Sequence, residues 1–85
     1  MSVKIRFFST LRNAAGVDGV EVSAGTVGDA VRRLEERFRG NADFIRLLNM
    51  SNVILNGNNV TFLKGTSTRV ADGDDLVFFP PLGGG

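Results

Sequence analysis

The sequence ends in three glycines, Gly83–Gly85, and few of its other groups react readily to form covalent bonds. There is neither cysteine nor histidine, so thiolate and imidazole chemistry are missing. What remains is the terminal carboxylate of Gly85, on an arm without side chains that a partner's backbone can approach closely. Pro80 and Pro81 hold this arm extended, because proline fixes φ and lacks an N–H. We therefore predict that Gly85, with Gly84, is a reactive terminus rather than a frayed end.

Length, composition and charge predict a single domain. The chain has 85 residues, of which 42% are hydrophobic and seven are phenylalanine, enough for a core without disulfides. A net charge of +1 indicates no dedicated anionic partner. No signal peptide is visible and no apolar run approaches the roughly 20 residues that span a bilayer, so we expect a cytoplasmic protein without a membrane partner. Four arginines alternate with glutamates on one predicted helix, which favours a solvent-exposed face over a nucleic-acid site: Arg32, Arg33, Arg37 and Arg39, with Glu35 and Glu36.

Two strands and a helix are expected in the first half of the chain. Val3, Ile5 and Phe7 alternate with polar residues, which is typical of a half-buried strand. Residues 13–16 are predicted to form a loop that leads to a second strand at 20–23. Residues 26–29 resemble a capping box, so a helix is predicted from Val27 to about Arg39, with Gly40 as its stop.

The second half predicts a short helix and three strands. Residues 43–50 form a helical turn in this interpretation, and residues 53–55 a buried strand. Asn56-Gly57 then predicts a tight hairpin into a short strand at 60–63. The turn at 72–74 leads to the last strand, 76–79.

This order predicts an α+β fold of the β-grasp (ubiquitin-like) type. One main helix must cover one face of a mixed, four- to five-stranded sheet. The right-handed crossover rule is satisfied if the first and last strands lie parallel and adjacent at the centre. We expect residues 1–82 to form this domain and residues 83–85 to be a flexible glycine tail.

The C-terminal residues resemble a known family. Residues 76–85, Leu-Val-Phe-Phe-Pro-Pro-Leu-Gly-Gly-Gly, after Asp72-Gly73-Asp74, are similar to the C-terminal signature of ubiquitin-like sulfur carriers of the MoaD/ThiS type. Residues 4–12 and Thr26-Val27 also fit, and the likeness is greatest to the molybdopterin synthase small subunit and the small archaeal modifiers. The family usually ends in two glycines after another residue type, a position that Gly83 occupies here.

The resemblance implies a carrier rather than an enzyme, with no cofactor of its own. A ubiquitin-activator-like adenylating enzyme would use ATP-Mg to activate the Gly85 carboxylate, and a sulfurtransferase would supply sulfur for a thiocarboxylate. That group would serve molybdopterin, thiamin or tRNA biosynthesis, with the molybdopterin synthase large subunit as a further partner. Two alternatives stay open: a ubiquitin-like modifier joined to target lysines, and a non-covalent interaction domain.

Two further sets of residues bear on function. Asp72, Asp74 and Asp75 favour a turn over a metal or catalytic cluster, so no metal site is predicted. If Phe7 and Phe78 face the helix, Phe8 and Phe79 lie together on the open face beside the tail, unless a twist or bulge tucks one of them inside. The family resemblance implies that such a surface docks on the adenylating enzyme. The predicted partner-binding residues are Phe8, Phe79, Pro80, Pro81 and Leu82, with Phe62 as an extension.

Overall fold

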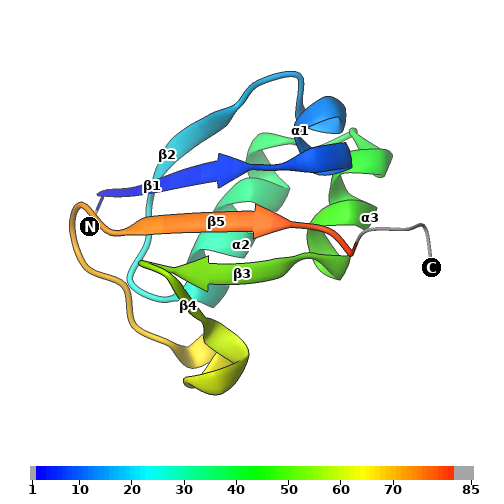
Figure 1. The fold of residues 1–85 in the computed structure, drawn as a ribbon. Coiled ribbons are helices and arrows are strands. Elements are labelled where there is room, and N and C mark those ends of the chain that lie inside the picture. Colours follow the sequence, from blue (N-terminus) through cyan, green and yellow to red (C-terminus); the bar gives the residue numbers. More distant parts are fainter. Residues whose placement is uncertain (1, 82–85) are drawn as a thin grey trace.

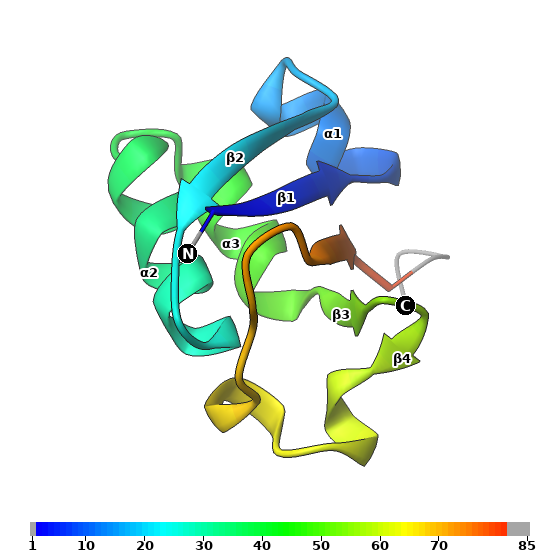
Figure 2. The same cartoon turned by 90° about the vertical axis from the view of Figure 1, so that its left-hand side faces the viewer.

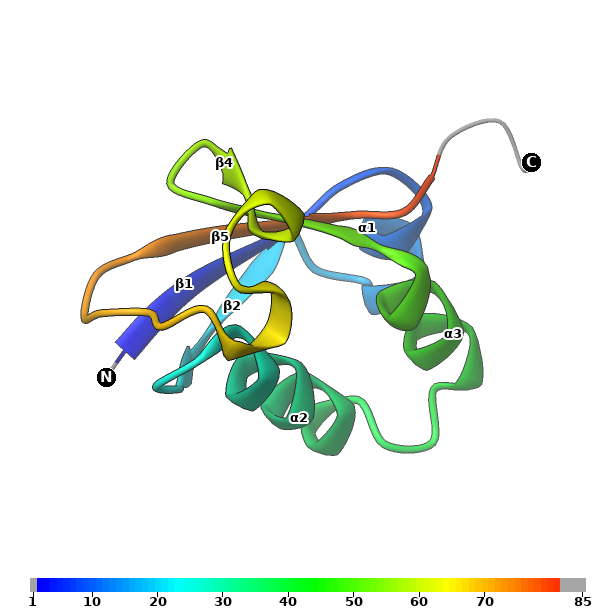
Figure 3. The ribbon, with the colours of Figure 1, turned by 90° about the horizontal axis from the view of Figure 1, so that it is seen from below.

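The computed structural model describes residues 2–81 and shows a five-stranded sheet with its two longer helices on one face (Figures 1 and 3). The sheet has the order β2-β1-β5-β3-β4. Residue 1, Leu82 and the predicted glycine tail lie outside the described residues. The elements are β1 Ser2–Phe7, α1 Ser9–Ala15, β2 Gly19–Ser23, α2 Val27–Arg37, α3 Ala42–Met50, β3 Asn52–Leu55, β4 Asn58–Asn59, the 3₁₀ turns η1 Val60–Phe62 and η2 Gly65–Ser67, and β5 Asp75–Phe79.

The first and last strands form the parallel centre of the sheet. β1 pairs with β5 in a register that sets Phe7 beside Phe78, while β2, β3 and β4 join by antiparallel pairing. This arrangement confirms the predicted β-grasp topology. Parallel pairing means that β1 and β5 end at the same side of the molecule (Figure 1).

The core lies between this sheet and the helices. Alternate residues of the central strands, such as Ile5, Phe7 and Phe78, are buried, as the period of two predicts. The Phe7 ring packs edge-on against Phe38 and Phe44, with centroids 5.8 and 5.3 Å away, and those two rings stack at 4.0 Å. Such pairs contribute about 0.5–1.5 kcal/mol each beyond their buried area, so this cluster fixes the helices against the sheet.

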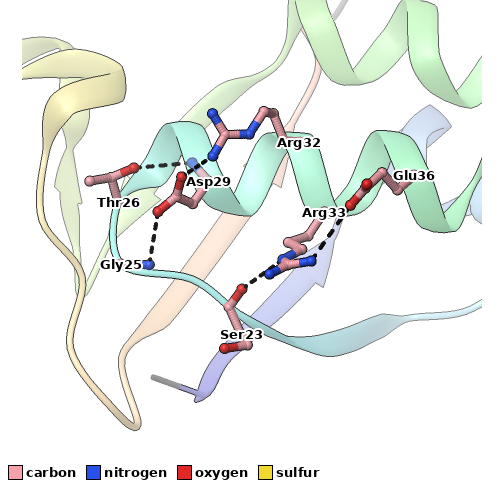
Figure 4. A network of polar contacts seen from close by, with 7 residues as sticks. All are labelled: Ser23, Gly25, Thr26, Asp29, Arg32, Arg33 and Glu36. Carbon is pink, nitrogen blue, oxygen red and sulfur yellow. Dashed lines mark hydrogen bonds and ion pairs between the residues drawn. The ribbon is translucent and has the colours of Figure 1, made fainter.

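The N-terminus of α2 is capped as predicted (Figure 4). The Thr26 hydroxyl accepts a hydrogen bond from the Asp29 N–H at 3.1 Å, and the Asp29 carboxylate accepts one from the Gly25 N–H at 3.2 Å. Asp29 also pairs with Arg32. The helix ends at Arg37, two residues before the predicted end, and Gly40 follows with φ of +90°.

The prediction of a loop at residues 13–16 was wrong. Helix α1 occupies 9–15 and ends at Gly16, whose φ is +76° and whose N–H donates to the Arg12 carbonyl. Leu11 is buried and Ala14 and Ala15 pack against the core, so their i, i+3, i+4 spacing was the signal for this helix. Its seven residues fall below the length at which helical periodicity is easily recognised.

The predicted strand at 60–63 was also wrong, although the preceding hairpin is confirmed. Asn56 and Gly57 have φ of +48° and +90° and join β3 to β4 as a two-residue turn. β4 contains only two residues, after which the Asn59 side chain accepts a hydrogen bond from the Thr61 N–H at 2.9 Å. This local bond turns the backbone into η1 instead of a longer strand. The helix predicted at 43–50 is confirmed as α3.

Candidate functional site

The polypeptide leaves the sheet at the end of β5, beside the end of β1. The Phe8 N–H donates a hydrogen bond to the Phe78 carbonyl at 3.1 Å, which continues the parallel pairing past Phe7. Pro80 is buried, so the chain is held against the fold up to this point. Pro81 is exposed and is the last described residue. The predicted reactive residues Gly84 and Gly85, with Leu82, follow it outside the described residues.

An apolar patch lies on the open face of the sheet at this exit. Phe8 is 46% exposed, and Phe79 is half-buried on the face opposite to Phe78. The register places Phe8 next to Phe79, because Phe7 pairs with Phe78. Ile54 and Val77 pair across β3 and β5 and are half-buried without joining the core. We call these four residues, Phe8, Ile54, Val77 and Phe79, the open-face patch.

Sequence reasoning identified the aromatic half of this patch and missed the aliphatic half. Val77 alternates with buried Leu76 and Phe78, so the period of two already assigned it to the face of Phe79. Ile54 was hidden in the apolar run 53–55, in which only the pairing with β5 reveals which side chain leaves the core. The pairing thus extends the patch along β5 and over one further strand, β3.

A charged residue frames the patch on its β1 side. The Arg6 guanidinium forms two hydrogen bonds to the Asp75 carboxylate, at 2.7 and 3.2 Å, and lies over the Phe8 ring with its carbon 5.9 Å from the centroid. The hydrogen bond and the charge of Asp75 raise the pKa of Arg6. An arginine is protonated over the whole pH range in which proteins fold. The position of Arg6 beside Phe8 orients an exposed aromatic side chain.

A groove of about 560 Å³ extends from Phe8 along β1 and β2. Its lining includes Arg12, Asp18 and Gly19. A side chain at Gly19 would collide with the Ile5 carbonyl oxygen, so glycine is needed for the close approach of β2 to β1. The open-face patch therefore continues into a groove that is lined by positively and negatively charged side chains.

The carboxylates of the acidic turn at 72–75 form hydrogen bonds and an ion pair with other residues of the fold. Asp72 accepts from the Ser2 N–H at 2.8 Å, and Asp74 accepts from the Ala71 N–H at 2.7 Å and from the Asn56 amide at 3.1 Å. Asp75 pairs with Arg6. Within residues 2–81 no three acidic side chains gather as a metal ion would require. The three carboxylates hold the start of β5 in place.

The structure does not bring Phe62 to the other predicted residues. It lies on η1, after β4, while Phe8 follows β1, and the sheet order places β5 and β3 between these strands. Phe62 is 86% exposed and belongs to the segment below the sheet edge in Figures 1 and 2. None of the helices in the described part of the chain is both long and apolar enough to cross a membrane.

Comparison with known proteins identifies the family of this fold and site. The family model described as "ThiS family" matches residues 5–85. Small archaeal modifier protein 3 of Haloferax volcanii is 36% identical over 94 residues, covering 100% of both chains. The molybdopterin synthase sulfur carrier subunit of Escherichia coli is 31% identical over 83 residues, covering 98% of this chain and 99% of its own.

Solved structures agree with the sequence relatives. Small archaeal modifier protein 1 from Methanosarcina acetivorans superimposes with a TM-score of 0.85 at 28% identity, covering 99% of this chain and 96% of that one. A chain of the Amycolatopsis orientalis BexX/CysO complex superimposes with a TM-score of 0.80 at 30% identity, covering 98% and 99%. That relative assembles with a protein partner. The chain described here therefore belongs to the ThiS family of ubiquitin-like sulfur carriers and small protein modifiers.

Proposed function

We propose that this protein is a sulfur carrier whose C-terminal carboxylate, on Gly85, is adenylated by a partner enzyme and then converted to a thiocarboxylate. The observation that supports it is the parallel pairing of β1 with β5, which lets the chain leave the sheet beside the open-face patch. A docked enzyme can therefore hold the patch and receive the terminus at once. The chain is the substrate of that enzyme rather than a catalyst.

The chemistry needs two displacements, both carried out by partners. A carboxylate oxygen of Gly85 attacks the α-phosphorus of ATP held with Mg²⁺ by the adenylating enzyme, and pyrophosphate leaves. A hydrosulfide equivalent from a sulfurtransferase then attacks the carbonyl carbon, and AMP leaves with the former carboxylate oxygen. The net change is one oxygen exchanged for sulfur. Glycines at the tail suit this reaction, because only a narrow arm can enter an enclosed site and be oriented for attack.

The open-face patch supplies the recognition that a featureless tail lacks. Exposed aromatic side chains dominate binding energy when a partner excludes water around them. Phe8 and Phe79 lie closest to the exit, and Ile54 and Val77 widen the apolar area. Pro81 continues the surface toward the tail, while buried Pro80 fixes the direction in which the chain leaves.

Intact-mass measurement tests the proposal directly. The protein is incubated with the adenylating enzyme of its own organism, ATP-Mg and a sulfur donor. We expect a mass increase equal to one oxygen-to-sulfur exchange, which alkylation of the thiocarboxylate then shifts again. A variant with one residue added after Gly85 is the matched control and stays unchanged. An unchanged wild-type mass, under conditions that convert an established carrier, overturns the proposal.

A modifier role is the second candidate function. The relationship to small archaeal modifier protein 3 over the full length of both chains favours it. The same acyl-adenylate would then be attacked by a lysine amine of a target protein, releasing AMP and leaving an isopeptide bond. Conjugates that resist thiol and hydroxylamine treatment would establish it, provided that their tryptic peptides carry residues 70–85 on a target lysine, since Arg69 is the last trypsin site in the sequence.

Molybdopterin synthesis is the sulfur-accepting pathway that the relatives favour most directly. The sulfur carrier subunit of Escherichia coli molybdopterin synthase covers almost the whole chain. We therefore propose the large subunit of that synthase as a further partner. Co-purification of thiocarboxylated protein with that subunit, and sulfur transfer to its precursor, is the expected result. Transfer only to thiamin or tRNA precursors would reassign the pathway.

A further inference from the structure

The segment between β4 and β5, residues 60–70, carries an apolar surface that the carrier function does not use. Phe62 is 86% exposed and Leu63 49% exposed, which makes Phe62 the most exposed of the large apolar side chains within residues 2–81. We call this segment the excursion. It lies below the sheet edge in Figures 1 and 2, away from the end of β5. Phe62 and Leu63 are consecutive and both exposed, and contiguous exposed apolar surface often marks an interaction site.

An apolar groove lies directly beside the excursion. Its volume is about 270 Å³, and its lining comes from α2, the end of α3, the start of β3, the excursion and Phe78 of β5. The excursion forms one wall through Thr61 and Gly65. Half of the twelve lining residues are apolar: Val27, Val31, Leu48, Val53, Val60 and Phe78. The exposed Phe62 directly follows Thr61 of the groove wall.

Opposite charges lie on the two sides of this face. On the excursion, Lys64 and Arg69 are exposed and form no ion pair with any residue among 2–81. Behind the far wall, Glu35 accepts a hydrogen bond from the Asn49 amide at 3.3 Å and likewise has no ion pair within that range. Asn49 itself lines the groove. The face thus carries a positive side and a negative side with the groove between them.

We propose that this face binds a second copy of the chain, with Phe62 of each copy in the groove of the other. A two-fold axis requires a surface that complements itself, and a projecting side chain beside a matching groove satisfies this requirement. The same rotation sets Lys64 of one copy toward Glu35 of the other, so the charges also match. A heterologous partner would need only one half of this arrangement. The presence of both halves on one face favours self-association.

The dimer is weak and leaves the carrier site free. A phenylalanine buries about 150–250 Å², so two of them with their surroundings make an interface below the roughly 1,200 Å² of standard complexes. The open-face patch and Pro81 belong to the other side of the sheet and its far end. The open-face patch and Pro81 of both copies therefore stay uncovered, and the proposal does not depend on what reaction the C-terminus undergoes.

Sedimentation equilibrium of the purified full chain tests this proposal, at concentrations up to about 1 mM, the weak end of the affinity scale. We expect a monomer–dimer equilibrium that Phe62→Ala weakens at least about tenfold, as for a central interface aromatic. Phe8→Ala, which removes an exposed phenylalanine from the other face, is the matched control and leaves the equilibrium unchanged. Thermal unfolding of both variants checks that the fold is kept.

Charge exchange gives the second arm of the test. Lys64→Glu weakens the dimer through repulsion with Glu35, and Lys64→Glu combined with Glu35→Lys restores it. A wild-type chain that stays monomeric at the highest concentration overturns the proposal, as does association that Phe8→Ala abolishes and Phe62→Ala does not. If the chain is monomeric and Phe62→Ala instead weakens binding to the adenylating enzyme, the face serves that enzyme and the second-copy assignment is overturned.

Discussion

Phe8 donates its backbone N–H to the Phe78 carbonyl at 3.1 Å, although Phe8 itself lies beyond the last residue of β1. The bond keeps the backbone of Phe8 extended for one more residue, until Ser9, with φ of +60°, turns the chain into α1. Phe8 therefore follows the alternation of β1 and directs its side chain away from buried Phe7. The exposed aromatic at the chain exit is thus a consequence of backbone pairing.

Removal of Gly84 and Gly85 should abolish adenylation and leave the fold intact. Glycine has no side chain to bury, so the loss of two terminal glycines should change the free energy of unfolding little. We expect a melting temperature close to that of the full chain, measured by circular dichroism, and no ATP–pyrophosphate exchange with the adenylating enzyme. Full exchange activity would exclude the terminus as the reactive site, and an unfolded variant would make the tail structural.

Phe8→Ala and Phe79→Ala should weaken binding to the adenylating enzyme more than they lower stability. Truncation of an aromatic anchor typically costs about 2 kcal/mol or more in affinity, a factor of about 30 in Kd. Isothermal titration calorimetry measures the affinity and thermal unfolding the stability. Met50→Ala is the matched control, because Met50 is 53% exposed and lies at the end of α3. A large loss of stability at unchanged affinity would mean that these rings serve the core instead.

The sequence predicted the architecture better than its irregular parts. Some local sequence signals each predict a single feature, and the structure contains all of those features. They are the alternation in β1 and β5, the Thr26 cap and the Asn56-Gly57 turn. Ile54 could not be placed without the pairing of β3 with β5, since an apolar run has no visible period. Residues 60–63 looked like a strand because a pattern of apolar residues does not reveal the hydrogen bond that the Asn59 side chain accepts from the Thr61 N–H.

Thr26→Ala should lower the free energy of unfolding by about 1 kcal/mol, within the range of about 0.5–2 kcal/mol for loss of an N-cap. The variant leaves the Asp29 N–H, now bonded to the Thr26 hydroxyl at 3.1 Å, without its partner. Urea unfolding followed by circular dichroism measures the effect. Thr26→Ser keeps a hydroxyl and is the control, expected to retain most of the stability. Equal losses in both variants would assign the effect to the lost methyl group rather than to the cap.

The last prediction concerns the outer edge of the sheet, where α2 protects β2. The Lys4 N–H donates toward β5 and not toward β2. Glu21 of β2 lies opposite Lys4, so its carbonyl points away from β1. The carbonyl of Ser23, two residues further along β2, points the same way. Arg33 donates to the Ser23 carbonyl at 3.2 Å (Figure 4) and Arg37 to the Glu21 carbonyl at 3.4 Å. Two arginines one helical turn apart thus occupy acceptors that another strand could otherwise use.

Arg33→Ala combined with Arg37→Ala should therefore promote association through β2 more than it lowers stability. Both side chains are exposed, and net hydrogen-bond contributions of about 0.5–1.5 kcal/mol each set an upper limit on the loss. We expect light scattering to rise with concentration and time in the double variant, and hydrogen exchange to accelerate at β2 in dilute samples. Arg12→Ala combined with Arg39→Ala, which removes two exposed arginines that donate to no β2 carbonyl, matches the change of two in net charge. If this pair associates as strongly as Arg33→Ala with Arg37→Ala, lost charge repulsion rather than an uncovered strand edge is the cause.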